Sequence, residues 1–197
     1  MHTKLYVVRH GQTRFNIEGK RQGQLDSPLT DLGRKQAAAV RDWFSEQNIR
    51  LDVAYTSDLG RALDTCRIIT QDAIPQYAAK ALQEISYGTL DGTSLPAPDM
   101  KAWEAGAAHD HGGETFLEAW TRFIQCLYQI AQANPDRNVL VVTHSALMVM
   151  MDQFLDAASG YEHNEFLRNG AVIELLYSSG RLWLLNNYSP ADRLLKN

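Results

Sequence analysis

The amino-acid sequence predicts an α/β sandwich built on a largely parallel sheet. Three short runs of aliphatic and β-branched residues, each bounded by polar residues, have the length and composition of buried strands. Amphipathic helical patterns alternate with these runs, which favours helices packed on a mostly parallel sheet. The chain has 197 residues, 45% of them hydrophobic, so we expect one globular domain spanning 1–197.

The N-terminal half contains two expected strands, each followed by a polar segment. Lys4–Val8 forms the first strand, and an irregular, glycine-containing loop follows from Gly11 to Pro28. Thr30 is the expected N-cap of a helix whose apolar face includes Ala37, Val40 and Phe44. The second strand, Val53–Tyr55, leads into a helix expected to begin at Ser57 and Asp58, with an apolar face formed by Leu59, Leu63, Cys66 and Ile69.

In a segment near the middle of the chain, about 90–113, apolar residues follow neither the helical nor the strand period. This segment contains two prolines and is expected to be a lid insertion. Regular patterns then resume. They predict a helix over Glu114–Asn134, a strand over Asn138–Thr143, a helix from Ser145 to about Leu155, and a hairpin of two strands, Ala171–Tyr177 and Leu182–Asn186, around Ser178-Ser179-Gly180. Met148, Met150 and Met151 are expected in the core.

Composition excludes several classes of function. A formal charge of −4 and a pI of about 5.8 argue against nonspecific binding to nucleic acid or anionic membranes. The longest apolar run, Ala146–Met151, is too short for a membrane span, and the first residues lack the apolar core of a signal peptide. Cys66 and Cys126 lie within helical patterns and are expected to be reduced core thiols. We therefore expect a soluble, cytoplasmic protein, a monomer or a homodimer.

Reactive side chains follow the predicted strands. Arg9-His10-Gly11 comes directly after the first strand, Ser57–Arg61 after the second and Thr143-His144-Ser145 after the third, while Glu84 lies in an irregular stretch. Ligands of open α/β sheets bind outside the carboxyl ends of the strands, so these groups are expected to converge.

Two arginines suit phosphate oxygens, and helix N-termini at Asp58 and Ser145 are expected to offer free N–H groups to the same anion. A neutral imidazole beside a bound phosphoryl group can attack phosphorus. Glu84 could protonate the leaving oxygen and then deprotonate water; the first role needs a raised pKa, which desolvation under a partly closed lid could supply. Because the cations belong to the protein, no metal or cofactor is required, and the expected partner is a small phosphorylated metabolite.

The sequence resembles the histidine phosphatase superfamily through five motifs in family order. Val8-Arg9-His10-Gly11-Gln12-Thr13, with Asn16 after it, resembles the R-H-G-E/Q-S/T signature. Gln22-Gly23 through Leu29-Thr30 to Gly33 resembles Q-G-x-x-D-x-P-L-T-x-x-G. The remaining motifs are Ser57-Asp58-Leu59-Gly60-Arg61-Ala62, Glu84 to Gly92, and Val142-Thr143-His144.

This resemblance implies a three-layer α/β/α sandwich with a mostly parallel central sheet, phosphoglycerate mutase-like, carrying the lid. It implies His10 as the nucleophile, Glu84 as the acid and base, and Arg9, Arg61 and His144 as the groups that hold the phosphoryl group. The implied phosphate- and substrate-binding residues are Gly11, Asn16, Gln22, Gly23, Tyr87 and Ser145. Ser145 stands where the family usually has glycine, so its hydroxyl either donates to the anion or crowds the pocket.

Hydrolysis of a phosphate monoester is the function we expect, and three alternatives stay open. A phosphoglycerate mutase needs cations for a second phosphate, whereas the segment 88–113 has one lysine, Lys101, against four acids, although Tyr87-Gly88 resembles the mutase version. A silent phospholigand-binding module would follow if Ser145 prevented turnover. A metal-dependent hydrolase would need the histidines of His109-Asp110-His111 with His163, which lack an ordered ligand spacing. Trp103 is a candidate for substrate contact.

Overall fold

The computed structural model describes residues 2–94, 109–163 and 167–195, so Trp103 and most of the predicted lid lie outside the described residues. The described strands form one seven-stranded sheet in the order β3-β2-β4-β1-β6-β7-β5. Their bounds are β1 His2–Arg9, β2 Val53–Thr56, β3 Gln76–Ala78, β4 Asn138–Thr143, β5 Asp156–Ala157, β6 Val172–Ser178 and β7 Arg181–Tyr188.

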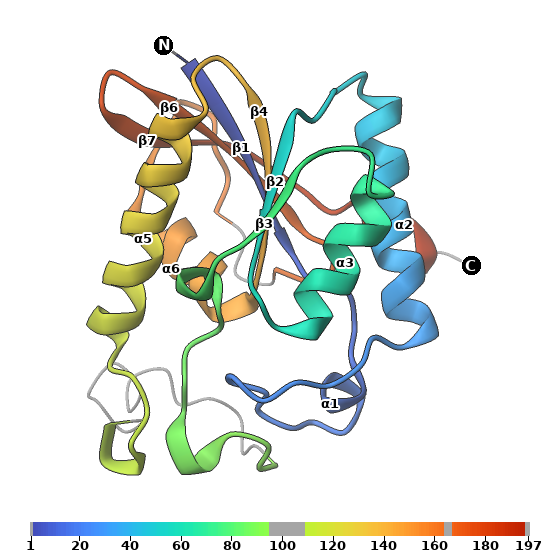
Figure 1. The fold of residues 1–197 in the computed structure, drawn as a ribbon, viewed down its shortest axis with the longest axis vertical. Helices are drawn as coiled ribbons and strands as arrows, with labels where there is room; N and C mark the ends of the chain where they lie inside the picture. The colour runs from blue at the N-terminus through green and yellow to red at the C-terminus, as the bar shows by residue number, and fades with distance from the viewer. Residues whose placement is uncertain (1, 95–108, 164–166, 196–197) are drawn as a thin grey trace.

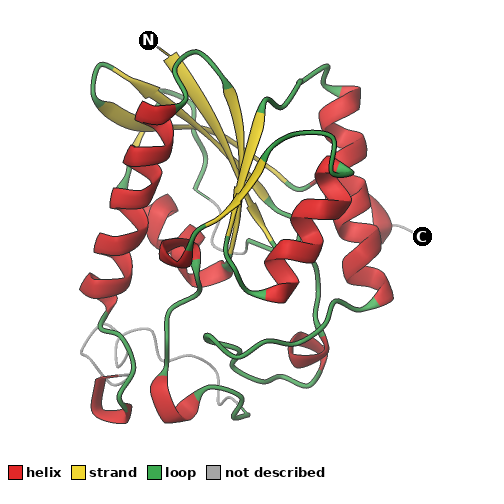
Figure 2. Ribbon diagram, viewed as in Figure 1, coloured by secondary structure: helices red, strands yellow, loops and turns green. Residues whose placement is uncertain are grey.

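The helices are α1 Arg14–Ile17, α2 Asp31–Glu46, α3 Gly60–Thr70, α5 Phe116–Ala133 and α6 Ser145–Phe154. Short 3-10 helices are η1 Lys80–Leu82, η2 Gly88–Leu90, η3 His109–His111 and η4 Pro190–Leu195. Figure 2 shows the sheet between helical layers, as the predicted α/β/α sandwich requires. Among the described residues, no helix combines the length and apolarity needed to cross a bilayer.

The sheet is parallel from β3 to β1 and antiparallel from β1 through β6 to β7, and the two-residue edge strand β5 pairs parallel with β7. Strand β4 lies between β1 and β2 and is parallel to both, whereas β6 pairs antiparallel with β1 and with β7. The β1–β4 register places Arg9 opposite Thr143, so the segments that follow these two residues leave the sheet side by side. The prediction of a mostly parallel α/β sheet is confirmed, with an antiparallel hairpin added at one side.

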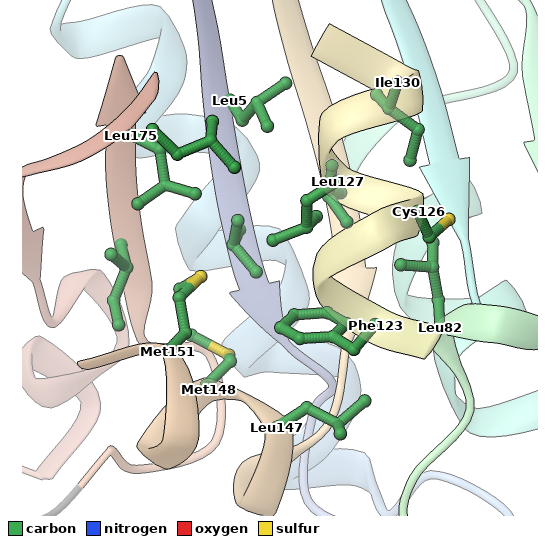
Figure 3. Close-up of a cluster of buried hydrophobic side chains, with 14 of the residues drawn as sticks. Leu5, Leu82, Phe123, Cys126, Leu127, Ile130, Leu147, Met148, Met151 and Leu175 are labelled. Carbon is green, nitrogen blue, oxygen red and sulfur yellow. The ribbon is translucent and has the colours of Figure 1, made fainter. Parts of the chain in front are cut away.

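Both faces of the central strands are covered, which explains their continuous hydrophobic sequence. Alternate side chains of β1 point to opposite faces, so Leu5 and Val7 join the core beneath α5 and α6 while Tyr6 and Val8 join the core beneath α2 and α3 (Figure 1). Figure 3 shows the first of these cores, where Met148 and Met151 pack near Phe123 and Leu127. The predicted core methionines and the free, buried Cys66 and Cys126 are thus confirmed.

Several boundaries differ from the sequence prediction. Helix α3 begins at Gly60, not at Ser57 and Asp58, because the Ser57 hydroxyl accepts a bond from Leu59 N and the N-terminal N–H groups of the helix are capped from another loop. The loop expected to be irregular contains the four-residue helix α1, whose N-terminus is stabilised by a Thr13–Asn16 capping box. The predicted hairpin is present, and Ser179 and Gly180 have φ angles of 51° and 78°, the signature of a two-residue turn.

Candidate active site

The two predicted site histidines lie next to each other beyond the carboxyl ends of β1 and β4. His10 follows the last residue of β1, and His144 follows the last residue of β4. Their ring centroids are 5.2 Å apart with an interplanar angle of 59°. His10 is 2% exposed and His144 is fully buried. Figure 1 shows these strands running toward the same end of the molecule, where the loop bearing α1 also lies.

The His10 imidazole is held in one orientation by the backbone. Its Nδ1 lies 2.7 Å from the carbonyl oxygen of Gly11, which can only accept, so Nδ1 carries the proton and Nε2 keeps its lone pair. The backbone of His10 is fixed as well, since its N–H donates to Thr143 O and its carbonyl accepts from Asn169 Nδ2. Burial, followed by the charges of Arg61 and Arg9, holds the pKa of His10 well below its usual value, so the ring is neutral at physiological pH.

Two buried guanidinium groups lie close enough to His10 to act on its charge. Arg9 donates from Nη1 to Leu167 O, and Arg61 donates from Nη1 to Leu25 O and from Nη2 to Gly23 O, both at 2.7 Å. Burial lowers the pKa of Arg9 to about 10 and also lowers that of Arg61, so both stay cationic at neutral pH. The Nε atoms of both, like the two ring nitrogens of His144, are buried and have no hydrogen-bond partner among the described residues.

A close approach of two glycines shapes the loop after His10. A Cβ on Gly11 would lie 2.3 Å from Gly33 O, and a Cβ on Gly33 would lie 2.0 Å from Gln12 O. Both distances are shorter than any side chain allows, so the loop can pack on the first turn of α2 only with glycine at both positions. Gly11 N also donates to Thr65 Oγ1, which fixes this loop to α3.

The carboxyl group of Glu84 lies at the N-terminus of α6, directly after His144. Its Oε2 accepts from Ala146 N at 3.2 Å and its Oε1 accepts from Ile85 N at 3.1 Å. Burial raises the pKa of Glu84, while these two bonds and the charges of Arg61 and Arg9 oppose the rise. Burial therefore favours the protonated acid, whereas the two N–H donors and the two cations favour the carboxylate.

Both helix N-termini that the sequence analysis assigned to phosphate are engaged by carboxylates instead. Ala146 N, in the first turn of α6, donates to Glu84, and Gly60 N and Arg61 N of α3 donate to Asp26 at 2.6 and 3.2 Å. The expectation of free N–H groups is wrong for these atoms, because a carboxylate satisfies a helix N-terminus as an anionic ligand would.

An ion pair that the sequence analysis missed holds the backbone around Glu84. Arg122 on α5 donates from Nε and Nη2 to the Glu114 carboxylate at 2.6 and 2.8 Å, and from Nη1 and Nη2 to three carbonyls, those of Ala81, Gln83 and Glu84, at 2.9, 2.7 and 3.0 Å. Glu114 also accepts from Ser86 N at 2.8 Å. One ion pair therefore fixes the segment on both sides of Glu84.

Asp26, Thr65 and Asn169 were also missed as supporting residues. Asp26 lies within the Q-G-x-x-D motif, so a signal for it was present in the sequence. No local pattern distinguishes Arg122 or Asn169, since the first occupies an ordinary amphipathic helix and the second a loop before β6.

The predicted substrate-binding residues surround these groups. Asn16 Oδ1 accepts from Thr13 N and caps α1, and the buried amide oxygen of Gln22 has no partner among the described residues. Gly23 has a φ of +50°, and its carbonyl binds Arg61. The Tyr87 ring lies beneath the Arg21 guanidinium, and Ser145 is the first, half-buried residue of α6.

The histidines weighed as metal ligands do not gather into a metal site among the described residues. His109 and His111 are exposed on η3, and His163 Nδ1 lies 3.1 Å from Asp152 Oδ2. Within the residues that the structure describes, no three His, Cys, Asp or Glu side chains group closely enough to hold a metal ion.

Comparisons with known proteins agree with this geometry. Residues 5–188 match the profile described as the histidine phosphatase superfamily (branch 1). A metal-independent phosphoserine phosphatase of Arabidopsis thaliana is 28% identical over 98% of this chain and 83% of its own length. A glucosyl-3-phosphoglycerate phosphatase of Mycolicibacterium vanbaalenii is 32% identical over 75% of this chain and 72% of its own. The solved structure of a phosphoglycerate mutase from Bacillus anthracis shares the fold, with a TM-score of 0.83 at 24% identity over 99% of this chain and 96% of its own.

Proposed function

We propose a mechanism for this chain from the premise that it belongs to the histidine phosphatase superfamily, branch 1, and is a phosphoric monoester hydrolase. In this mechanism the His10 imidazole takes the phosphoryl group from a small phosphate monoester and passes it to water. The observation that carries the proposal is the buried set of nitrogens around His10: Arg9 Nε, Arg61 Nε and the ring nitrogens of His144, which have no partner among the described residues. Buried polar groups in native proteins are almost always hydrogen-bonded, so this set is suited to phosphate oxygens.

In the first half-reaction, His10 Nε2 attacks phosphorus. The bond from Nε2 to phosphorus forms while the bond from phosphorus to the leaving oxygen breaks. The Nδ1 proton stays on the hydrogen bond to Gly11 O, which orients the ring and stabilises the positive charge that the imidazole acquires. The depressed pKa of His10 supports this role, because a protonated imidazole has no lone pair to donate.

Arg9, Arg61 and His144 stabilise the phosphoryl group during transfer. Negative charge spreads over its equatorial oxygens in the transition state, and fixed donors in a dry site stabilise such charge without reorganising. Arg9 and Arg61 supply two full positive charges, and the neutral His144 supplies one N–H donor.

Glu84 serves as the general acid and then as the general base. Its raised pKa favours a protonated carboxyl group that gives its proton to the leaving oxygen. In the second half-reaction the carboxylate accepts a proton from water, the water oxygen attacks phosphorus, and the bond to His10 breaks with release of inorganic phosphate.

The finer assignments concern the domain organisation, the cellular compartment and the natural substrate. We propose that residues 1–197 act as one domain, that the protein is cytoplasmic because Cys66 and Cys126 are free thiols, and that the natural substrate is a small phosphorylated metabolite. Relatives named for phosphoserine and for glucosyl-3-phosphoglycerate support a substrate of that size.

Phosphoenzyme trapping tests the mechanism. Brief incubation with a 32P-labelled phosphate monoester, followed by denaturation in alkali, is expected to leave base-stable label on a peptide containing His10. The His10→Ala variant is expected to carry no label and to lose hydrolysis of p-nitrophenyl phosphate. Hydrolysis without a labelled phosphoenzyme in the wild-type protein would refute the covalent mechanism. Interconversion of phosphoglycerates without release of phosphate would indicate the mutase alternative.

A further inference from the structure

One cation beside the active site takes no part in the reaction described above. The Arg21 guanidinium carbon lies 4.8 Å from the centroid of the Tyr87 ring. The backbone of Arg21 is held by two hydrogen bonds, since Arg21 N donates to Thr93 O at 2.9 Å and Arg21 O accepts from Gly92 N at 2.7 Å. In the part of the chain that the structure describes, the Arg21 guanidinium forms no hydrogen bond or ion pair besides this stacking, although its charge also acts on the Asp91 carboxylate, so the N–H groups at its edge can still bind an anion.

Arg21 is linked to Glu84, the proposed acid, through the Tyr87 side chain. Glu84 protonates the leaving oxygen in the proposed reaction, and Tyr87 follows Glu84 by three residues. Burial raises the pKa of Tyr87, the Glu84 charge raises it further, and the Arg21 charge opposes this, so Tyr87 lies within electrostatic reach of both groups. A substituent on a leaving group that Glu84 protonates would therefore come within reach of the Arg21 guanidinium by extending toward Tyr87.

The two residues that follow Arg21 in the chain connect it to the proposed phosphate site. Gly23, two residues further on, uses its carbonyl to hold Arg61 Nη2 at 2.7 Å. Gln22, between them, is 9% exposed and has a buried amide oxygen without a partner among the described residues. A ligand that reached from Arg61 to Arg21 would pass this amide, which can accept from a hydroxyl or an ammonium group.

We propose that Arg21 binds a carboxylate on the leaving group, so that the substrates of this enzyme are small phosphate monoesters carrying a carboxylate a few bonds from the ester oxygen. The proposal rests on the proposed function and names its substrate class. A guanidinium fork matches a carboxylate in a bidentate arrangement. A second phosphate fits less well, because Arg21 is a single cation and the Asp91 carboxylate lies within electrostatic reach of it.

A matched pair of substrates tests this assignment. 3-Phosphoglycerate and glycerol 3-phosphate differ only in that a carboxylate replaces a hydroxymethyl group, and p-nitrophenyl phosphate reports the reaction itself. We expect the wild-type enzyme to prefer 3-phosphoglycerate. In Arg21→Met, which keeps an apolar side chain against Tyr87, we expect the ratio of the two kcat/KM values to fall by about 10- to 100-fold, the effect of losing a charge-assisted hydrogen bond. Arg21→Lys is expected to recover part of the ratio.

Lys20→Met is the control, because Lys20 lies next to Arg21 in the chain but pairs with Glu18 at 2.7 Å and stacks on Phe15. It is expected to leave the ratio unchanged. Equal losses on all three substrates in Arg21→Met would assign Arg21 a structural role and overturn the proposal, as would an unchanged ratio. A wild-type preference for a bisphosphate that depends on Arg21 would also overturn it.

Failure of the proposed reaction would give a different result, because the wild-type protein would then hydrolyse none of the three esters. In that event, calorimetric binding of 3-phosphoglycerate and glycerol 3-phosphate decides the question. Preference for the carboxylate that is lost in Arg21→Met would support the recognition of a carboxylate, and equal binding of both compounds by the wild-type protein would refute it.

Discussion

Replacing Arg122 with methionine removes the cation that holds the Glu84 segment while keeping an unbranched apolar stem. The guanidinium donates to both oxygens of Glu114 and to the carbonyls of three residues, Ala81, Gln83 and Glu84. Methionine makes none of these bonds. Glu114 would keep the bond from Ser86 N but would lose its counter-ion.

The expected magnitude follows from the burial of the pair. Both side chains are 22% exposed, so water can reach them in part and the loss stays below the 3–5 kcal/mol that follows when a fully buried pair is broken. We expect the free energy of unfolding to fall by about 2–3 kcal/mol. The freed backbone would also let the Glu84 carboxyl move, and a misplacement of about 1 Å in a catalytic group costs roughly 100-fold in rate.

Leaving-group dependence separates the catalytic effect from a general loss of structure. Alkyl phosphates need protonation of the leaving oxygen, whereas p-nitrophenolate leaves without it, so kcat of Arg122→Met should fall about 100-fold on glycerol 3-phosphate and far less on p-nitrophenyl phosphate. Arg193→Met is the control: Arg193 pairs with Glu46 at 2.8 Å but is 41% exposed, and its loss should cost less than about 1 kcal/mol and leave kcat unchanged. Equal losses of kcat on both substrates in Arg122→Met would refute the reasoning.

Three further predictions follow from the same geometry. Glu84→Gln should lower kcat on alkyl phosphates by about 100-fold or more with a much smaller loss on p-nitrophenyl phosphate, and equal losses would assign the acid role elsewhere. Asp26→Ala removes the cap of α3 and an oxygen beside Arg61, so urea unfolding should show a loss of about 1–2 kcal/mol and inhibition by inorganic phosphate should weaken; unchanged inhibition would contradict the supporting role. His10 and His144 are neutral when folded, with pKa values well below 6.5, so the unfolded chain binds more protons below pH 6.5. Stability should therefore fall on acidification from pH 6.5, by about 1.4 kcal/mol per pH unit for each histidine, and a flat profile of unfolding free energy between pH 7 and 5 would argue against burial of both rings.

The sequence predicts those parts of the fold whose stability is local or follows from two-sided burial. Strands β1 and β4 contain the apolar runs Leu5–Val8 and Val139–Val142 because helices cover both of their faces, and α5 has a full apolar stripe. Strands β3 and β5 have three and two residues, too few to show a period of two, and they exist because the sheet beside them offers unpaired backbone groups. The four residues of α1 likewise depend on a capping box.

The candidate site likewise has residues that the sequence predicts and supporting residues that it does not predict. Arg9 ends β1, and His10 and His144 directly follow β1 and β4, so parallel topology alone brings these proposed phosphate contacts together, whereas Arg61 comes from the first turn of α3. Their supports come from distant elements: Asn169 reaches the His10 carbonyl from 159 residues away, and Arg122 reaches Glu84 from a helix that carries no motif. Such contacts are set by tertiary packing, which no local pattern encodes.

The carboxylates at the two helix N-termini change how the charge of the site is understood. Asp26 binds the N–H groups of Gly60 and Arg61, and Glu84 binds that of Ala146, so these three donors are not available to the phosphoryl group, and the full positive charges proposed to act on it are those of Arg9 and Arg61. For Glu84 this position matters chemically, because a helix N-terminus and two cations stabilise the carboxylate while burial favours the acid. A dianionic substrate adds negative charge beside Glu84 and raises its pKa further, so binding itself favours the proton donor that the first half-reaction needs. Once the leaving group has departed with that proton, the same cations favour the carboxylate that must accept a proton from water.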